Sequence, residues 1–192
     1  MLEQIKKIRE QTGAGMVDVK KALEESGGDE SKAIDILRKK GQSKAVKKAE
    51  REVGEGIIGS YIHSNGKIGA MVKLYCETDF VARNEEFQEL AKDIAMHISA
   101  MNPQFLNPED VTEEVIAKEK EIWLEQMKDE NKPEEIKQKI MEGKEKKFRE
   151  EMSLMTQSFV KNPDVTVGEL VTEKISKVGE NIKVGDFVRF EL

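Results

Sequence analysis

The segment from Cys76 to Val81 (Cys-Glu-Thr-Asp-Phe-Val) places a carboxylate beside a large aromatic ring, between an expected strand and an expected helix. Asp79 and Phe80 are therefore candidates for an exposed tip. A ring that supplies apolar contact and a carboxylate that supplies charge suit insertion into a partner protein. Alternatively, Phe80 packs under the following helix and Asp79 caps that helix. The residue types leave both interpretations open.

Side chains that could make or break covalent bonds are few. The chain contains one cysteine and two histidines, and neither His63 nor His97 has another histidine or a cysteine at metal-ligand spacing. Cys76 lies among aliphatic strand residues, so we expect a small core residue rather than a nucleophile. Phosphate-binding glycine loops and the nucleophile elbow are absent from the sequence. We expect no enzyme active site, no metal site and no cofactor.

The composition indicates a soluble and highly charged protein. Among 192 residues, 32 Lys and Arg oppose 38 Asp and Glu, and charged residues make up 36% of the chain. That share exceeds the roughly 25% of ordinary globular chains and predicts much solvated helix surface. The sequence has no apolar run approaching the roughly 18 residues of a membrane span, and Met1–Glu10 lacks the apolar run of a signal peptide. We therefore expect a cytoplasmic protein that does not bind membranes.

Positive charge is concentrated between Arg38 and Arg51, where seven of fourteen residues are basic. Such a stretch can bind phosphates, so an RNA-binding or ribosome-associated protein is one hypothesis. The other is a solvated helix end followed by a linker, because cations favour a helix C-terminus. The stretch contains no aromatic residue that could stack on bases, and the chain as a whole is acidic. We favour the second interpretation and expect no direct binding to nucleic acid.

The first 53 residues predict a helical module with a basic linker. Apolar residues recur at helical spacing in three short segments that glycines separate. The helices are expected before the break at 12–15, over 16–26 and over 29–41, with Asp29 as an N-cap and Gly41 ending the third. Ala45 to Val53 is expected to form a short connecting helix. By itself, such a module also fits an adaptor that binds ubiquitin-like proteins.

Residues 54–192 predict an α+β core with a small antiparallel sheet packed by helices. Strand-like segments at 57–63 and 67–76 flank Ser64-Asn65-Gly66. This is a good hairpin signal, because Asn-Gly favours turns with positive φ. A final strand over 181–192 is expected to complete the sheet. Helices over 84–101 and 165–178 are expected to pack against it.

Two long, charged helices are expected in the sequence between the helix over 84–101 and the helix over 165–178. The first runs from Val111 to about Asp129, with Trp123 as a packing residue. The second starts near Pro133, which the first turn of a helix tolerates, and its apolar residues continue to Met155. Together they predict a coiled-coil-like helical hairpin over about 111–156 that projects from the body. Two ordinary surface helices are the alternative, and periodicity alone does not separate them.

Two motifs resemble the signatures of a known family. Thr12 to Leu23 (TGAGMVDVKKAL) closely resembles the N-terminal signature of the bacterial translation elongation factor Ts family. Cys76 to Arg83 (CETDFVAR) resembles the family's second signature. Further similarities at Ala95–Ile98 and Thr166–Leu170 follow in order, so the resemblance covers nearly the whole chain.

This resemblance implies a guanine nucleotide exchange factor for elongation factor Tu, the GTPase that delivers aminoacyl-tRNA. Such a factor binds the GDP form, speeds GDP release and leaves a nucleotide-free complex that GTP resolves. It makes and breaks no covalent bond, so it is not an enzyme in the usual sense. The resemblance also implies a three-helix N-terminal domain like the ubiquitin-associated (UBA) fold, followed by a core with a sheet and a helical hairpin.

The resemblance further implies where the partner binds. Phe80 would wedge between helices of the GTPase near its magnesium site, with Asp79 beside it. Losing support for Mg²⁺ weakens the hold on the β-phosphate, because the ion and the phosphate loop share that charge. The expected partner contacts are Thr78, Asp79, Phe80 and Val81 in the tip, Gly15, Met16, Val17 and Lys20 in the N-terminal signature, and His97 near the phosphate loop of the partner.

The chain departs from the long members of the family, which contain two related core subdomains. Here one core, residues 54–192, carries both the Thr-Asp-Phe motif and the Met-His segment. A single core is expected to need a second copy to complete the sheet. We therefore predict a homodimer through the core, with the strand Asp186–Leu192 as a candidate interface, and a two-plus-two complex with the GTPase.

Overall fold

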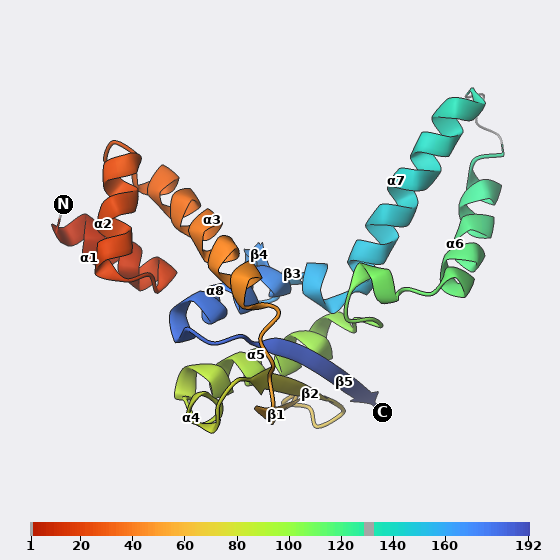
Figure 1. Ribbon diagram of the computed structural model, residues 1–192. Helices are drawn as coiled ribbons and strands as arrows, with labels where there is room; N and C mark the ends of the chain where they lie inside the picture. Colours follow the sequence, from red (N-terminus) through yellow and green to blue (C-terminus); the bar gives the residue numbers. More distant parts are fainter. Residues whose placement is uncertain (1, 129–132) are drawn as a thin grey trace.

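The computed structural model describes residues 2–128 and 133–192 and shows the expected mixture of helices and antiparallel strands (Figure 1). Its N-terminal module consists of α1 (Leu2–Thr12), α2 (Met16–Glu25) and α3 (Glu30–Lys48). Asp29 caps α3 by accepting a hydrogen bond from the Lys32 N–H at 3.1 Å, as predicted. The three helices fit the expected UBA-like arrangement. Their apolar residues form a cluster of their own, made of Ile5, Ile8, Val19, Ala22, Leu23, Ala33 and Leu37.

Helix α3 is longer than the sequence predicts. We expected it to end at Gly41 and a separate connecting helix to span Ala45–Val53, but α3 runs unbroken to Lys48, so both expectations are wrong. Gly41 faces α8 (Val167–Val178), and Ala45 is buried in the cluster of the core. Packing against the core therefore outweighs the weak helix propensity of glycine. As a result, one continuous helix joins the N-terminal module to the core.

The core is built on a three-stranded antiparallel sheet in the order β1-β2-β5. Its strands are β1 (Glu55–Ile62), β2 (Ile68–Cys76) and β5 (Lys183–Glu191). The predicted Asn65-Gly66 turn joins β1 and β2: Gly66 has a φ of 67°, and the Asn65 side chain accepts a hydrogen bond from the Lys67 N–H at 2.9 Å. The predicted hairpin and the predicted final strand are both confirmed.

One face of the sheet is covered by α5 (Glu85–Met101). Gly59 of β1 allows the helix to approach closely, because a Cβ at this position would lie only 2.6 Å from the Ala91 carbonyl oxygen. Asn84 caps the helix through a hydrogen bond from the Glu86 N–H at 2.8 Å. The apolar residues that recur at helical spacing in this helix are all buried, namely Phe87, Leu90, Ile94 and Ile98.

The opposite face of the sheet, which we call the outer face, carries exposed apolar side chains. Met71 and Val188 are direct partners across β2 and β5, and Ile62 and Phe190 flank Gly69 from either side. Ile62 is 74% exposed and Phe190 is 65% exposed. Their strands alternate, so these residues lie on the side of the sheet away from α5. The apolar members of the outer face are Ile58, Ile62, Met71, Val188 and Phe190.

Helices α6 (Glu113–Gln126) and α7 (Glu134–Met152) project from the core as an antiparallel pair, which confirms the predicted hairpin (Figure 1). Trp123 packs edge-on against Phe148, with ring centroids 5.8 Å apart. The predicted end of α6 at Asp129 lies outside the described residues. Met155 lies beyond α7, in a short 3₁₀ helix (Leu154–Thr156), so the second helix is shorter than predicted.

A small two-stranded sheet, β3 (Ser158–Phe159) with β4 (Asn162–Thr166), was not predicted from the sequence. Val165 belongs to β4, so the predicted start of the following helix is wrong by two residues. That helix, α8, begins with a capping box in which Thr166 and Glu169 satisfy each other's backbone N–H groups. In the described part of the chain, no helix combines the length and apolar character needed to cross a bilayer.

Candidate partner-binding site

The predicted tip forms a four-residue helix, α4 (Asp79–Ala82), which follows β2 and packs beside β1 (Figure 1). The Phe80 side chain is 80% exposed. Thr78, not Asp79, caps the helix, because its hydroxyl accepts a hydrogen bond from the Val81 N–H at 3.5 Å. The alternative in which Phe80 packs under the following helix and Asp79 acts as the cap is therefore wrong.

The two sides of α4 face different environments. Val81 and Ala82 pack against the core, which fixes the helix in place. Phe80 points away from this contact, and leaving such a ring exposed forgoes roughly 1.5–3 kcal/mol of burial energy. Asp79 forms an exposed ion pair with Arg83, with 2.9 Å between Oδ2 and Nη2. The tip thus offers an apolar ring and a carboxylate on an anchored base, which suits docking to a protein.

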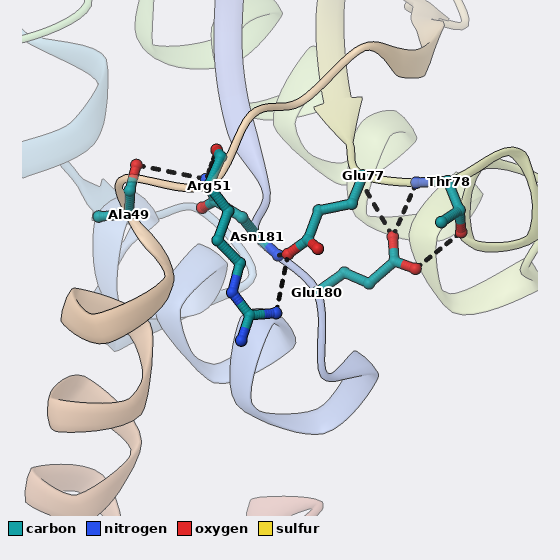
Figure 2. Close-up of polar contacts among 6 residues, drawn as sticks. All are labelled: Ala49, Arg51, Glu77, Thr78, Glu180 and Asn181. Carbon is teal, nitrogen blue, oxygen red and sulfur yellow. Dashed lines mark hydrogen bonds and ion pairs between the residues drawn. The ribbon is translucent and has the colours of Figure 1, made fainter.

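The base of the tip is polar and is held by residues from distant parts of the chain (Figure 2). Glu180, just after α8, accepts hydrogen bonds from the backbone N–H groups of Glu77 and Thr78 at 3.2 and 3.0 Å. It also accepts one from the Thr78 hydroxyl at 2.7 Å. The residue that caps α4 is therefore itself fixed by a carboxylate.

Cys76, at the end of β2, is fully buried, which confirms the predicted core role. Its thiol donates a hydrogen bond to the Thr78 carbonyl, with 3.2 Å between sulfur and oxygen. Burial raises the pKa of the Cys76 thiol above its ordinary value. A buried thiol that keeps its proton is a poor nucleophile and contributes packing instead.

The N-terminal signature forms a second exposed surface at the start of α2. Met16 is 48% exposed and Val17 is 67% exposed. Gly15 precedes them as the N-cap of α2. Lys20 follows one turn later, 3.8 Å from Glu24 in an exposed pair. Figure 1 places α2 in the N-terminal module and α4 at the edge of the core, so the two candidate surfaces occupy separate regions.

His97 is placed differently from the other predicted contacts, because it is completely buried in α5. Its Nδ1 accepts a hydrogen bond from the Val160 N–H at 3.2 Å, and its Nε2 lies 2.9 Å from Oε1 of Gln157. This pattern requires the proton on Nε2 of a neutral ring. Burial lowers the pKa of His97 below its ordinary value, against a smaller opposing effect of Gln157. The imidazole therefore fixes the β3–β4 segment from inside.

Comparison with known proteins shows the family of the chain. The family model described as elongation factor TS matches residues 3–192. Proteins named elongation factor Ts are 60% identical in Thermodesulfovibrio yellowstonii, over 99% of this chain and 94% of the relative, and 58% identical in Thermosipho melanesiensis, over 97% and 95%. Another in Rubrobacter xylanophilus is 53% identical over 100% of this chain and 98% of the relative. The chain belongs to the elongation factor Ts family.

The match to the elongation factor Ts family extends through the residues that support the tip as well as through the tip. The sequence gives no signal for Glu180, Asn181 or Gln157, although all three make hydrogen bonds in or beside the candidate site. Glu180 follows the helix-ending Gly179, and Asn181 begins the predicted final strand, so the local pattern indicates no role for either side chain. Their partners near β2 lie more than 100 residues away in the sequence, where no spacing rule connects them.

Proposed function

We propose that the chain is a guanine nucleotide exchange factor that acts on elongation factor Tu during translation elongation in the cytoplasm. The observation that carries this proposal is the exposed Phe80 on an anchored helix, within a chain whose relatives are named elongation factor Ts. Exchange needs binding and distortion, not bond making, so the protein acts without a covalent step.

In this mechanism the tip acts on the partner's magnesium site. Phe80 inserts between helices of the GTPase, and Asp79 accompanies it after exchanging its ion pair with Arg83 for contacts in the complex. Thr78 and Val81 keep α4 in position while the ring is inserted. Displaced groups around Mg²⁺ no longer support the charge on the β-phosphate, and GDP leaves. Because coupling is reciprocal, a factor that weakens GDP binding is itself released when nucleotide rebinds.

The start of α2 would form the second contact. Gly15, Met16, Val17 and Lys20 present an apolar surface with one cation, and we propose that they bind the G domain of the partner. The predicted contact of His97 with the phosphate loop requires Gln157 and Val160 to release the buried ring first. The tip and α2 therefore carry the direct contacts, while His97 supports the structure until such a release occurs.

We also propose that two copies associate through the outer face of the sheet, which would give a two-plus-two complex. Its exposed Ile58, Ile62, Met71, Val188 and Phe190 suit burial against an identical surface. Phe190→Asp would place a carboxylate in that contact, so a monomer is expected in sedimentation equilibrium. A parent chain that is monomeric at all concentrations, or a Phe190→Asp variant that remains dimeric, would contradict the proposed interface.

An RNA-binding function gains little support from the basic segment of α3. Lys40 pairs with Glu25 at 2.8 Å, and Lys44 pairs with Asp18 at 2.9 Å. The Lys44 ammonium, as the largest cause, holds the pKa of Asp18 below its ordinary value. Intramolecular carboxylates therefore compensate part of this positive charge.

The test of the proposed function is release of a fluorescent GDP analogue from elongation factor Tu. Substoichiometric amounts of the chain should accelerate release of analogue from several equivalents of GTPase when unlabelled nucleotide is in excess. The Asp79→Ala/Phe80→Ala double variant, folded by circular dichroism, should lose this acceleration. A parent chain that leaves the release rate unchanged with its cognate GTPase would refute the proposal.

A further inference from the structure

Three segments that are far apart in the sequence meet next to Thr78, the N-cap of α4 (Figure 2). They are the end of β2 at Glu77-Thr78, the turn Glu180-Asn181 between α8 and β5, and the linker after α3 at Ala49–Arg51. Two of the side chains that join them, Glu180 and Asn181, belong to no predicted contact surface. Their arrangement supports α4 through its N-cap, Thr78.

Glu180 supplies the support closest to α4. Both of its carboxylate oxygens accept hydrogen bonds: Oε2 from the N–H groups of Glu77 and Thr78, and Oε1 from the Thr78 hydroxyl at 2.7 Å. Because that hydroxyl donates to Glu180, its lone pair remains available to accept the Val81 N–H. The carboxylate therefore fixes both the backbone that enters α4 and the orientation of the cap. Bonds to a charged acceptor are stronger than bonds between neutral groups.

Asn181 and Glu77 extend the support to the linker. Glu77 Oε1 accepts a hydrogen bond from the Asn181 N–H at 2.6 Å and lies 3.5 Å from Nη1 of Arg51. The Asn181 side chain, which is only 2% exposed, donates to the carbonyls of Arg51 and Ala49 at 2.9 and 3.4 Å. The turn is thus held on one side by the end of β2 and on the other by the chain leaving α3.

We propose that Glu180 is a positioning residue for nucleotide exchange, which holds α4 so that Phe80 enters the partner in one fixed orientation. This inference rests on the proposed exchange function and adds a residue that acts without touching the partner. A ring on a loosened helix can still bind, but it must be ordered again during insertion, and this ordering costs free energy. Loss of Glu180 should therefore lower the maximal rate of GDP release more than the apparent affinity for the GTPase.

The test is a double-mutant cycle between Glu180→Ala and Phe80→Ala. The maximal rate of GDP-analogue release is measured at saturating chain for the parent, each single variant and the double variant. Glu180→Ala alone should reduce this rate by about tenfold, as expected for a misplaced group. In the Phe80→Ala background it should change the rate by less than about twofold, because coupled residues act non-additively.

Conservative variants separate positioning from simple loss of stability. In Glu180→Gln, the amide oxygen can still accept the two backbone N–H groups and the NH₂ can donate to Thr78, so the rate should stay within about threefold of the parent. Glu180→Asp is too short to reach all three donors and should lose rate as Glu180→Ala does, which provides a measurement if the alanine variant fails to fold. Glu52→Ala, which removes an exposed carboxylate in the linker, is the matched control and should behave as the parent.

Two results would overturn the inference while leaving the proposed function intact. One is a parent-like maximal rate for both Glu180→Ala and Glu180→Asp. The other is an equal, additive loss in the parent and Phe80→Ala backgrounds, since a role that does not pass through the tip would persist without the ring. A parent chain that does not accelerate GDP release would instead refute the proposed function, and the positioning role with it.

Discussion

The tip at Phe80 and the interior at His97 were both predicted to contact a partner, yet the structure builds them in opposite ways. Phe80 is an apolar ring exposed to solvent on a helix with a polar support, whereas His97 is a polar ring enclosed in the core. An exposed apolar side chain on a fixed helix gains its burial energy only when another surface covers it. A buried polar side chain with both nitrogens occupied already has its partners. We propose direct recognition for the first arrangement and structural support for the second.

The largest expected effect on stability comes from removing the buried ring. His97→Ala would leave Gln157 and the Val160 N–H without their partner and create a cavity beside Phe159, so the free energy of unfolding should fall by about 2–4 kcal/mol. Urea denaturation measures this change. His63→Ala removes an exposed histidine from the same chain and should shift the value by less than about 0.5 kcal/mol. Equal effects of the two substitutions would remove the distinction between interior and surface.

A pH titration of stability should isolate the same residue. The pKa of His97 is lowered on folding from its ordinary value of 6.5, because burial disfavours the charged ring. Below pH 6.5 the unfolded chain binds a proton that the folded chain does not, so stability should fall as the pH decreases and level off below the folded pKa.

This component differs from those of the lysine-paired carboxylates, whereas Glu173, whose pKa is raised from 4.5 by burial, titrates in parent and variant alike. The pKa of Asp18 and the pKa of Glu86 are lowered from 3.8 and 4.5 by lysine partners, so their contributions are lost only at more acidic pH. Between pH 6.5 and about 5, His97→Gln should therefore remove a stability slope that the parent shows. Thermal unfolding at several pH values checks this, and parallel curves for parent and variant would contradict it.

The smallest expected effect concerns the exposed ion pair of the tip. Arg83→Ala frees the Asp79 carboxylate, and since the pair is solvated the free energy of unfolding should change by less than about 0.5 kcal/mol. In the exchange assay, the chain concentration giving half-maximal GDP release should fall by about twofold, because Asp79 then has no ion pair with Arg83 to break on docking. A large loss of stability would show that Arg83 supports α4 and that the exposed side of the tip is structural after all.

Local signals account for much of what the sequence predicted. The Asn65-Gly66 turn, the helix over 84–101 and the cap at Asp29 each depend on neighbouring residues, and the structure confirms them. The continuation of α3 through Gly41 depends instead on packing against α8, which overrides local propensity.

The support of the candidate site was beyond sequence reasoning for a similar reason. The exposed Phe80 was one of two open alternatives, because burial of a single ring depends on which surfaces meet in the fold. Glu180 and Asn181 reach backbone groups more than 100 residues away, and any polar turn residue has the same local appearance. The short strand β4 contains Pro163, a residue that strand patterns exclude, so its pairing with β3 gave no signal.

The most direct test of the account is the maximal rate of GDP-analogue release for Phe80→Ala, with the free energy of unfolding measured on the same sample. Leu124→Ala, which removes an exposed apolar side chain from the helical hairpin, is the matched control. We expect Phe80→Ala to lower the rate by about 100-fold with stability within about 0.5 kcal/mol of the parent, and Leu124→Ala to change neither. A folded Phe80→Ala variant that exchanges nucleotide at the parent rate would contradict the central role of the tip.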